Sequence, residues 1–253
     1  MIEKKRKFFC IMKVLLALAA LAVAFFVIQS RGKKFSSVVF QSIEYIARPH
    51  SGPSFEPIVS RAAWYGSKLH QGDYLINISA HDQETLTRAV KNIPVNKTLG
   101  ELTKDDLTLP PLLEQVISGS TWRDHLANGL GFVAIRGIPT QNWSVEEARR
   151  FFWIFGLKIG RPGLQDSASD SYLTDIRDTK SNNPQTDRQY KTNAAQNYHV
   201  DMADVVGLLC LQTAGKGGGI SRLISSVTIF NELLKTPNGK RHAARLYNSG
   251  SFS

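Results

Sequence analysis

Apolar positions recur every three or four residues in two stretches of the chain, which is the spacing of a helix with one buried face. Residues 81–93 (HDQETLTRAVKNI) carry acidic side chains early and basic ones late, an order that suits the helix dipole. Residues 144–160 begin with Ser144 as a candidate N-cap and Glu147 at the capping-box position. The pattern predicts a helix in each stretch.

Three further stretches have helical features with weaker boundaries. Residues 109–129 have prolines near the start, apolar residues spaced by three and four, and Gly129 as a candidate C-cap, so we predict one helix there. Residues 220–236 begin like a strand and end like a helix. Residues 103–107 (TKDDL) predict a turn or a helix start.

Short β-rich runs predict strands between these helices. Residues 131–139 (GFVAIRGIP) predict a strand followed by a turn, and residues 204–212 (DVVGLLCLQ) predict a buried strand. Residues 215–219 (GKGGG) predict a turn. Residues 161–198 are long and polar, which is typical of a functional loop or lid, with a candidate short strand at 171–178. The order of elements predicts an α+β fold.

An apolar segment near the N-terminus predicts a membrane anchor. Residues 14–28, together with 8–12, reach the length of a membrane-spanning helix across residues 8–29. Five Lys or Arg residues precede residues 14–28 and three follow them closely, which favours a cytoplasmic N-terminus and a type II signal anchor. The alternative is a cleaved signal peptide, which would make the protein secreted, although the residues that follow form a poor cleavage site.

Composition shifts divide the chain into four expected parts. They are a signal anchor or transmembrane segment (1–35), a linker rich in Ser, Pro and Gly (36–60), a folded body (61–236) and a divergent polar tail (237–253).

The positive charge of the chain is concentrated at the N-terminus. The net charge is +10, of which +7 lies in residues 1–34 and +3 in all the rest. A body with so little excess charge does not indicate a polyanion-binding surface, so we expect no nucleic-acid partner. Cys10 and Cys210 cannot supply a disulfide framework within the body. Glycosylation sequons occur at Asn77, Asn96 and Asn142, and they matter only if the body is lumenal.

One short motif carries candidate chemistry. His199 and Asp201 lie two residues apart, so in an extended chain both side chains point the same way. An imidazole nitrogen and a carboxylate oxygen that converge can hold a divalent cation, and two histidines with one carboxylate form the site of non-haem Fe(II) oxygenases. By itself this spacing also fits a surface histidine beside a turn aspartate.

The sequence around the motif is more informative. Residues 198–226 (YHVDMADVVGLLCLQTAGKGGGISRLISS) resemble the TauD/TfdA family of taurine dioxygenase-like enzymes, especially its fungal-type members. That family has an H-x-D before an apolar strand, a Gly-Gly turn and then a Ser or Thr. The resemblance extends over roughly residues 56–235, with agreeing stretches at 64–69, 109–116, 131–139, 159–167 and 175–178.

This resemblance implies a fold, cofactors and site residues. The implied fold is a double-stranded β-helix, a jelly-roll of the clavaminate synthase-like type, with flanking helices. The implied metal is Fe(II), with 2-oxoglutarate as co-substrate and His199 and Asp201 as two of three iron ligands. Ser221 stands where the family has a hydroxyl that contacts a 2-oxoglutarate carboxylate. Asn193 and Asn197 are candidates to face the co-substrate or substrate, although turn chemistry explains both as well.

The C-terminal part departs from the family pattern. The family's third ligand is a histidine more than a hundred residues beyond the H-x-D, followed by an Arg that binds 2-oxoglutarate, whereas 52 residues follow Asp201 here. His242 is the one later histidine, and we expect it to be a solvated surface residue. We therefore expect a C-terminally truncated member with an incomplete jelly-roll, which is either a truncated or mis-spliced product of a longer gene or a shortened homologue completed by self-association.

Three hypotheses follow from these observations. The first is a dioxygenase that hydroxylates a small organic substrate and converts 2-oxoglutarate to succinate and CO₂, with its activity in question because the distal His and Arg are absent. The second is a membrane-anchored, non-catalytic remnant or binding protein of the same fold. The third is a membrane-surface protein whose basic N-terminus binds anionic lipid.

Overall fold

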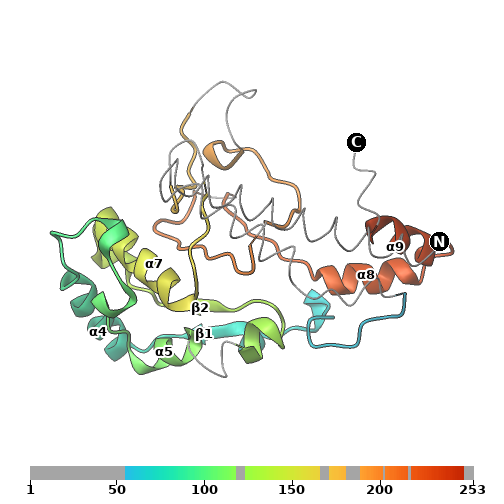
Figure 1. Cartoon of the computed structure of the whole chain (residues 1–253), viewed down its shortest axis with the longest axis horizontal. Helices are drawn as coiled ribbons and strands as arrows, with labels where there is room; N and C mark the ends of the chain where they lie inside the picture. Colours follow the sequence, from blue (N-terminus) through green and yellow to red (C-terminus); the bar gives the residue numbers. More distant parts are fainter. Residues whose placement is uncertain are drawn as a thin grey trace, which may run out of the picture. The chain divides into compact units, whose positions relative to one another are not determined.

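The computed structural model describes residues 55–117, 123–165, 171–180, 189–201, 203–215 and 218–247. The expected anchor at residues 8–29 lies outside these residues. No helix within the described ranges is both long and apolar enough to cross a membrane. The contacts form two units, one within Pro162–Asp204 and the other combining Ser51–Arg161 with Val205–Ser253. Figure 1 shows the element labels along the chain.

Two well-capped helices confirm the clearest predictions from the sequence. Helix α4 (Ala80–Lys91) begins after Ser79, whose Oγ accepts a hydrogen bond from the backbone N–H of Asp82 at 3.1 Å. Helix α7 (Val145–Ile159) begins after Ser144, whose Oγ accepts from the N–H of Glu147 at 3.1 Å. The Glu147 carboxylate in turn accepts from the N–H of Ser144 at 2.7 Å, which completes the predicted capping box.

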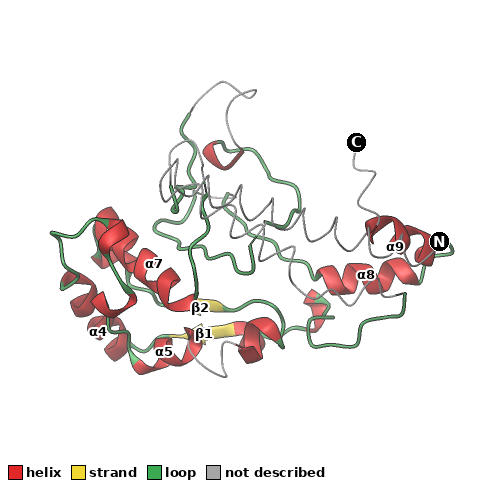
Figure 2. Ribbon diagram, in the orientation of Figure 1, coloured by secondary structure: helices red, strands yellow, loops and turns green. Residues whose placement is uncertain are grey.

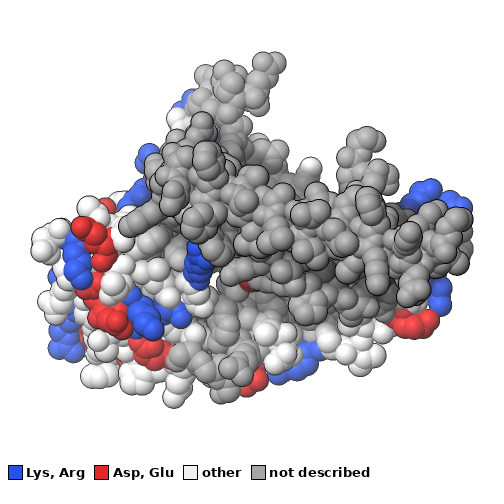
Figure 3. Space-filling view, in the orientation of Figure 1, with Lys and Arg blue, Asp and Glu red and all other residues white. Residues whose placement is uncertain are grey.

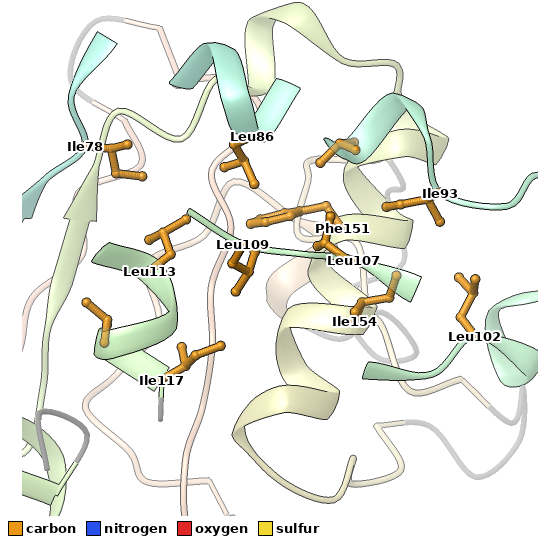
Figure 4. Packing of buried hydrophobic residues seen from close by; sticks show 12 residues of the cluster. Ile78, Leu86, Ile93, Leu102, Leu107, Leu109, Leu113, Ile117, Phe151 and Ile154 are labelled. Atoms are coloured by element: carbon orange, nitrogen blue, oxygen red, sulfur yellow. The ribbon is translucent and has the colours of Figure 1, made fainter. Parts of the chain in front are cut away.

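The apolar faces of these helices form the core of the second unit, together with α5 (Pro111–Ile117). Figure 4 shows Phe151 and Ile154 of α7 among side chains from α4, α5 and the segments that connect them. Lys158 of α7 also forms an ion pair with Glu114 of α5, with 2.9 Å between Nζ and Oε1. The buried members of the core are Ile78, Leu86, Val90, Ile93, Leu102, Leu107, Leu109, Leu113, Val116, Ile117, Phe151 and Ile154.

A short parallel sheet borders this core. Strand β1 (Leu75–Asn77) pairs with β2 (Ala134–Arg136), with Leu75 opposite Ala134 and Asn77 opposite Arg136. The strand predicted within 131–139 is confirmed, in a shorter form. The sequence analysis missed β1, because three residues carry too little alternation to stand out.

Segments far apart in the sequence meet at the C-terminal helices α8 (Ser226–Leu234) and α9 (Gly239–Tyr247). The Oγ of Ser225, the N-cap of α8, donates to the carbonyl of Ala62 at 2.5 Å. Thr228 Oγ1 donates to the carbonyl of Trp64 at 2.8 Å. Asn231 of α8 forms two hydrogen bonds with the backbone of Ile58. Residues 58–64 are therefore bound to α8, although more than 160 residues of chain separate them.

The remaining elements are short. They are η1 (Gly66–Lys68), α3 (Gln71–Tyr74), η2 (Leu99–Glu101), η3 (Lys104–Asp106), the π-helical turn η4 (Arg123–Ala127), η5 (Thr140–Asn142) and η6 (Gln189–Lys191). The 3₁₀ turn η3 lies within residues 103–107, where the sequence predicted a turn or a helix start.

In the described residues, the helix expected at 109–129 is present as α5 and the π-helical turn η4, and residues 118–122 lie outside the described ranges. Two other sequence predictions were wrong. The candidate strand at 171–178 is not a strand, and residues 204–212 form neither a strand nor a buried segment, since Leu208 is 69% exposed. An apolar run becomes a buried strand only when a neighbouring strand takes its backbone hydrogen bonds. The described part of the chain contains the β1–β2 pair as its only sheet, and helices and loops predominate (Figure 2).

Candidate metal site

His199 and Asp201 lie near the C-terminal end of the first unit, in a segment without regular secondary structure, and their side chains converge. The distance between His199 Nε2 and Asp201 Oδ1 is 3.8 Å. Such convergence follows from the i, i+2 spacing in extended chain, where alternate side chains share a face. The structure therefore brings the two predicted ligands together.

The imidazole of His199 is held by its other nitrogen. Nδ1 lies 2.8 Å from the backbone carbonyl oxygen of Asn197, and a carbonyl can only accept a hydrogen bond. In the neutral ring the proton is then on Nδ1, which leaves the lone pair of Nε2 facing Asp201. Metal-binding histidines use the same arrangement, because a hydrogen bond to the second nitrogen fixes the tautomer and the ring orientation.

The spacing of the two donor atoms fits one metal ion. Imidazole nitrogen and carboxylate oxygen bind transition metals at about 2.0–2.2 Å, so two such atoms on one ion are at most about 4.4 Å apart. The observed 3.8 Å lies within that limit. The donor set, one imidazole and one carboxylate, also suits non-haem Fe(II).

The site is open to solvent. The side chains of His199 and Asp201 are each 57% exposed. Within the residues that the structure describes, no group of three or more His, Cys, Asp or Glu side chains could hold a metal ion. Two exposed donors leave most positions of an octahedral ion to water or to a co-substrate, which favours weak metal binding.

The other predicted site residues have different positions. Asn193 is exposed in a bend that follows η6, and Asn197 contributes its backbone carbonyl rather than its side chain to His199. The sequence analysis missed this role of Asn197, because a backbone acceptor leaves no residue-type signal. Ser221 is exposed in the second unit, after Gly219 with its φ of 69°, and its contact with 2-oxoglutarate stays a prediction. His242 is partly buried on α9 rather than fully solvated.

Charged side chains of both signs are mixed on the face of the molecule drawn in Figure 3. Blue Lys and Arg side chains alternate there with red Asp and Glu side chains over the helical part of the second unit. Among the described residues of this unit, Lys97 pairs with Asp106 at 2.6 Å and Arg150 pairs with Glu146 at 3.0 Å.

A family model matches the part of the chain that contains this site. The model for taurine catabolism dioxygenase TauD, TfdA family, matches residues 95–239, which include His199, Asp201 and Ser221. The chain belongs to the TauD/TfdA family. Members of this family typically use Fe(II) and 2-oxoglutarate, and the family fold is a double-stranded β-helix.

One curated relative is FR-33289 synthase from Streptomyces rubellomurinus (strain ATCC 31215). It is 34% identical to this chain over 114 residues, which are 44% of this chain and 33% of the relative. The chain thus spans about a third of the length of the relative that it matches.

The TauD/TfdA family fold and the described structure agree only in part. Residues 203–212 and 218–225 lie inside the matched region, but in the described ranges they form no strand-to-strand ladder. Segment 205–211 instead lies against α7, where a Cβ built on Gly207 would be 3.2 Å from the ring of Phe152. Thr140 Oγ1 donates to the carbonyl of Cys210 at 3.2 Å.

Proposed function

We propose that this chain is an Fe(II)- and 2-oxoglutarate-dependent dioxygenase that hydroxylates a small organic substrate. The observation that carries the proposal is the convergence of His199 Nε2 and Asp201 Oδ1 at 3.8 Å, with the imidazole oriented by the carbonyl of Asn197. Membership of the TauD/TfdA family supports it, because the pair lies inside the matched residues.

The residues have distinct roles in this proposal. His199 and Asp201 hold the iron, and Asn197 is a positioning residue that keeps Nε2 directed at the ion. Ser221 donates a hydrogen bond to a carboxylate of 2-oxoglutarate, and Asn193 offers an amide to the same co-substrate. Bound Fe(II) supplies the redox chemistry by which 2-oxoglutarate and O₂ yield succinate, CO₂ and the hydroxylated product.

Succinate formation tests the proposal. The purified chain is incubated with Fe(II), ascorbate, 2-oxoglutarate and O₂, beside the variants His199→Ala and His242→Ala. We expect succinate from the unmodified chain and from His242→Ala, because His242 lies on α9 outside the H-x-D motif and has no role in the proposed site. We expect none above background from His199→Ala. Equal succinate from all three proteins, or none from the unmodified chain, would reject catalysis by this polypeptide.

A non-catalytic binding protein of the same family is the second candidate function. It is favoured by the exposure of both donors and by the absence of a third candidate ligand among the described residues. Such a protein would bind 2-oxoglutarate in an Fe(II)-dependent way and release no succinate. Anaerobic calorimetry should show Fe(II)-dependent binding of 2-oxoglutarate for either candidate, so the succinate assay separates them: binding without succinate identifies the non-catalytic protein.

The cellular setting is proposed from the sequence. Residues 8–29 anchor the chain as a type II signal anchor, or the protein is secreted if this segment is cleaved. The basic residues beside the anchor add affinity for anionic lipid. Flotation with vesicles that contain phosphatidylserine tests this, since the full chain should float and a chain that lacks residues 1–35 should not.

A further inference from the structure

Three glycosylation sequons share one position relative to the helices of the second unit. In each Asn-x-Ser/Thr sequence the hydroxyl residue is the N-cap of a helix: Ser79 for α4, Thr98 for η2 and Ser144 for α7. The asparagine therefore lies two residues before each cap, outside the helix. The three acceptor candidates are Asn77, Asn96 and Asn142.

Asn77 is exposed because of strand alternation. It is the last residue of β1, where Ile76 packs against the core and Ile78 is only 5% exposed. Neighbouring side chains of an extended segment point to opposite sides, so the side chain of Asn77 points to solvent. Its place at the strand end is held by the pairing with Arg136.

Asn96 is exposed at the tip of an anchored turn. Before it, Ile93 is buried and the carbonyl of Pro94 accepts a hydrogen bond from Arg150 at 2.7 Å. After it, Lys97 is bound to Asp106. Its neighbour Val95 is 82% exposed, so the tip of the turn has room for a large attached group.

Asn142 has a similar setting at the end of η5. Pro139 is fully buried on one side of it, and Trp143 on the other packs against Phe151, with 4.9 Å between the ring centroids. Asn142 itself is exposed. At all three positions the neighbouring residues fix the backbone while the asparagine faces water.

Helix capping alone explains the hydroxyl residues but not the asparagines. A Ser or Thr N-cap satisfies a backbone N–H of the first turn, whatever residue stands two positions earlier. The exposure of Asn77, Asn96 and Asn142 is the additional requirement for a surface glycan, which is bulky and solvated.

We propose that Asn77, Asn96 and Asn142 are acceptors of N-linked glycans, on a body that the signal anchor delivers to the lumen of the secretory pathway. The donor is an oligosaccharide linked to a lipid diphosphate. The amide Nδ2 of each asparagine forms a bond to C1 of the first sugar and gives up one proton, while the bond from C1 to the phosphate oxygen breaks and the lipid diphosphate leaves. This proposal is independent of the iron site.

Translation of the full chain in the presence of microsomal membranes tests the proposal. Glycan number is read from gel mobility before and after endoglycosidase treatment, and lumenal location from protection against added protease. The variants are Asn77→Gln, Asn96→Gln and Asn142→Gln, each of which leaves its capping hydroxyl in place. Asn92→Gln is the matched control, because Asn92 is exposed near Asn96 but lies in Asn-Ile-Pro.

We expect a protected chain with three endoglycosidase-sensitive steps in mobility, of which each acceptor variant loses one and Asn92→Gln loses none. Thr98→Ser should keep its step, since it preserves both the sequon and the cap. A chain that is protected but unchanged by endoglycosidase would overturn the assignment of acceptors. A chain digested by protease would overturn the lumenal location, and an acceptor variant with unchanged mobility would overturn the proposal for that asparagine.

Discussion

Replacing Phe151 with alanine should lower the free energy of unfolding by about 4 kcal/mol, within the range of about 3–5 kcal/mol found for such changes. Phe151 is 2% exposed in the middle of α7, and its ring lies 4.9 Å from that of Trp143 and 5.6 Å from that of Phe155, measured between centroids. Loss of the buried side chain removes about 2 kcal/mol of transfer free energy. A cavity on the order of 100 Å³, at about 24 cal/mol per Å³, adds about 2 kcal/mol.

The assay is urea unfolding followed by far-ultraviolet circular dichroism, with Val145→Ala as the control. Val145 is also on α7 but is 62% exposed, so its truncation should change the free energy of unfolding by less than about 0.5 kcal/mol. If Phe151→Ala does not fold, Phe151→Leu keeps most of the volume, and loss of its ring contacts should cost about 1 kcal/mol. Equal effects of the Phe151 and Val145 variants would refute the assignment of the core to α4, α5 and α7.

Three further predictions follow from local contacts. Ser144→Ala should lower the free energy of unfolding by about 1 kcal/mol in the same assay, because it removes the cap of α7, and Ser144→Thr should restore most of it. Hydrogen bonds from the backbone and hydroxyl of Ser144 lower the pKa of Glu147 from its ordinary 4.5. The stability that the Glu147 carboxylate contributes should therefore be complete above pH 4.5 and should be lost as the pH falls through the lower pKa of the folded state. Glu147→Gln should flatten this part of a stability–pH profile. Leu208 and Val206 are 69% and 53% exposed in an apolar segment, so we expect the chain to self-associate through this segment. Leu208→Lys should then reduce the sedimentation coefficient to that of a monomer, and an unchanged coefficient would argue against self-association through Leu208.

Helices were predictable where their signals are local. Ser144 and Glu147 lie three residues apart, and the capping box they form depends on no other part of the chain. The sequence also predicted that His199 and Asp201 would converge, because an extended backbone is enough to place i and i+2 on one face.

Strands were predicted less well, because their hydrogen-bond partners are distant in the sequence. Strand β1 exists through its pairing with β2, which lies almost 60 residues later in the chain. The apolar run at 204–212 has the composition of a buried strand, yet composition cannot show whether a neighbouring strand is present to pair with it. For the same reason the contacts of residues 58–64 with α8 had no signal in the sequence.

The most direct test of the central claim is the Fe(II) affinity of a double-mutant cycle, measured by anaerobic calorimetry on the unmodified chain, His199→Ala, Asp201→Ala and the double variant. If both side chains hold one ion, each single change should remove most of the affinity and the double variant should lose little more, because coupled ligands are not additive. The same Fe(II) affinity in all four proteins, or independent losses that simply add, would contradict a shared iron site at His199 and Asp201.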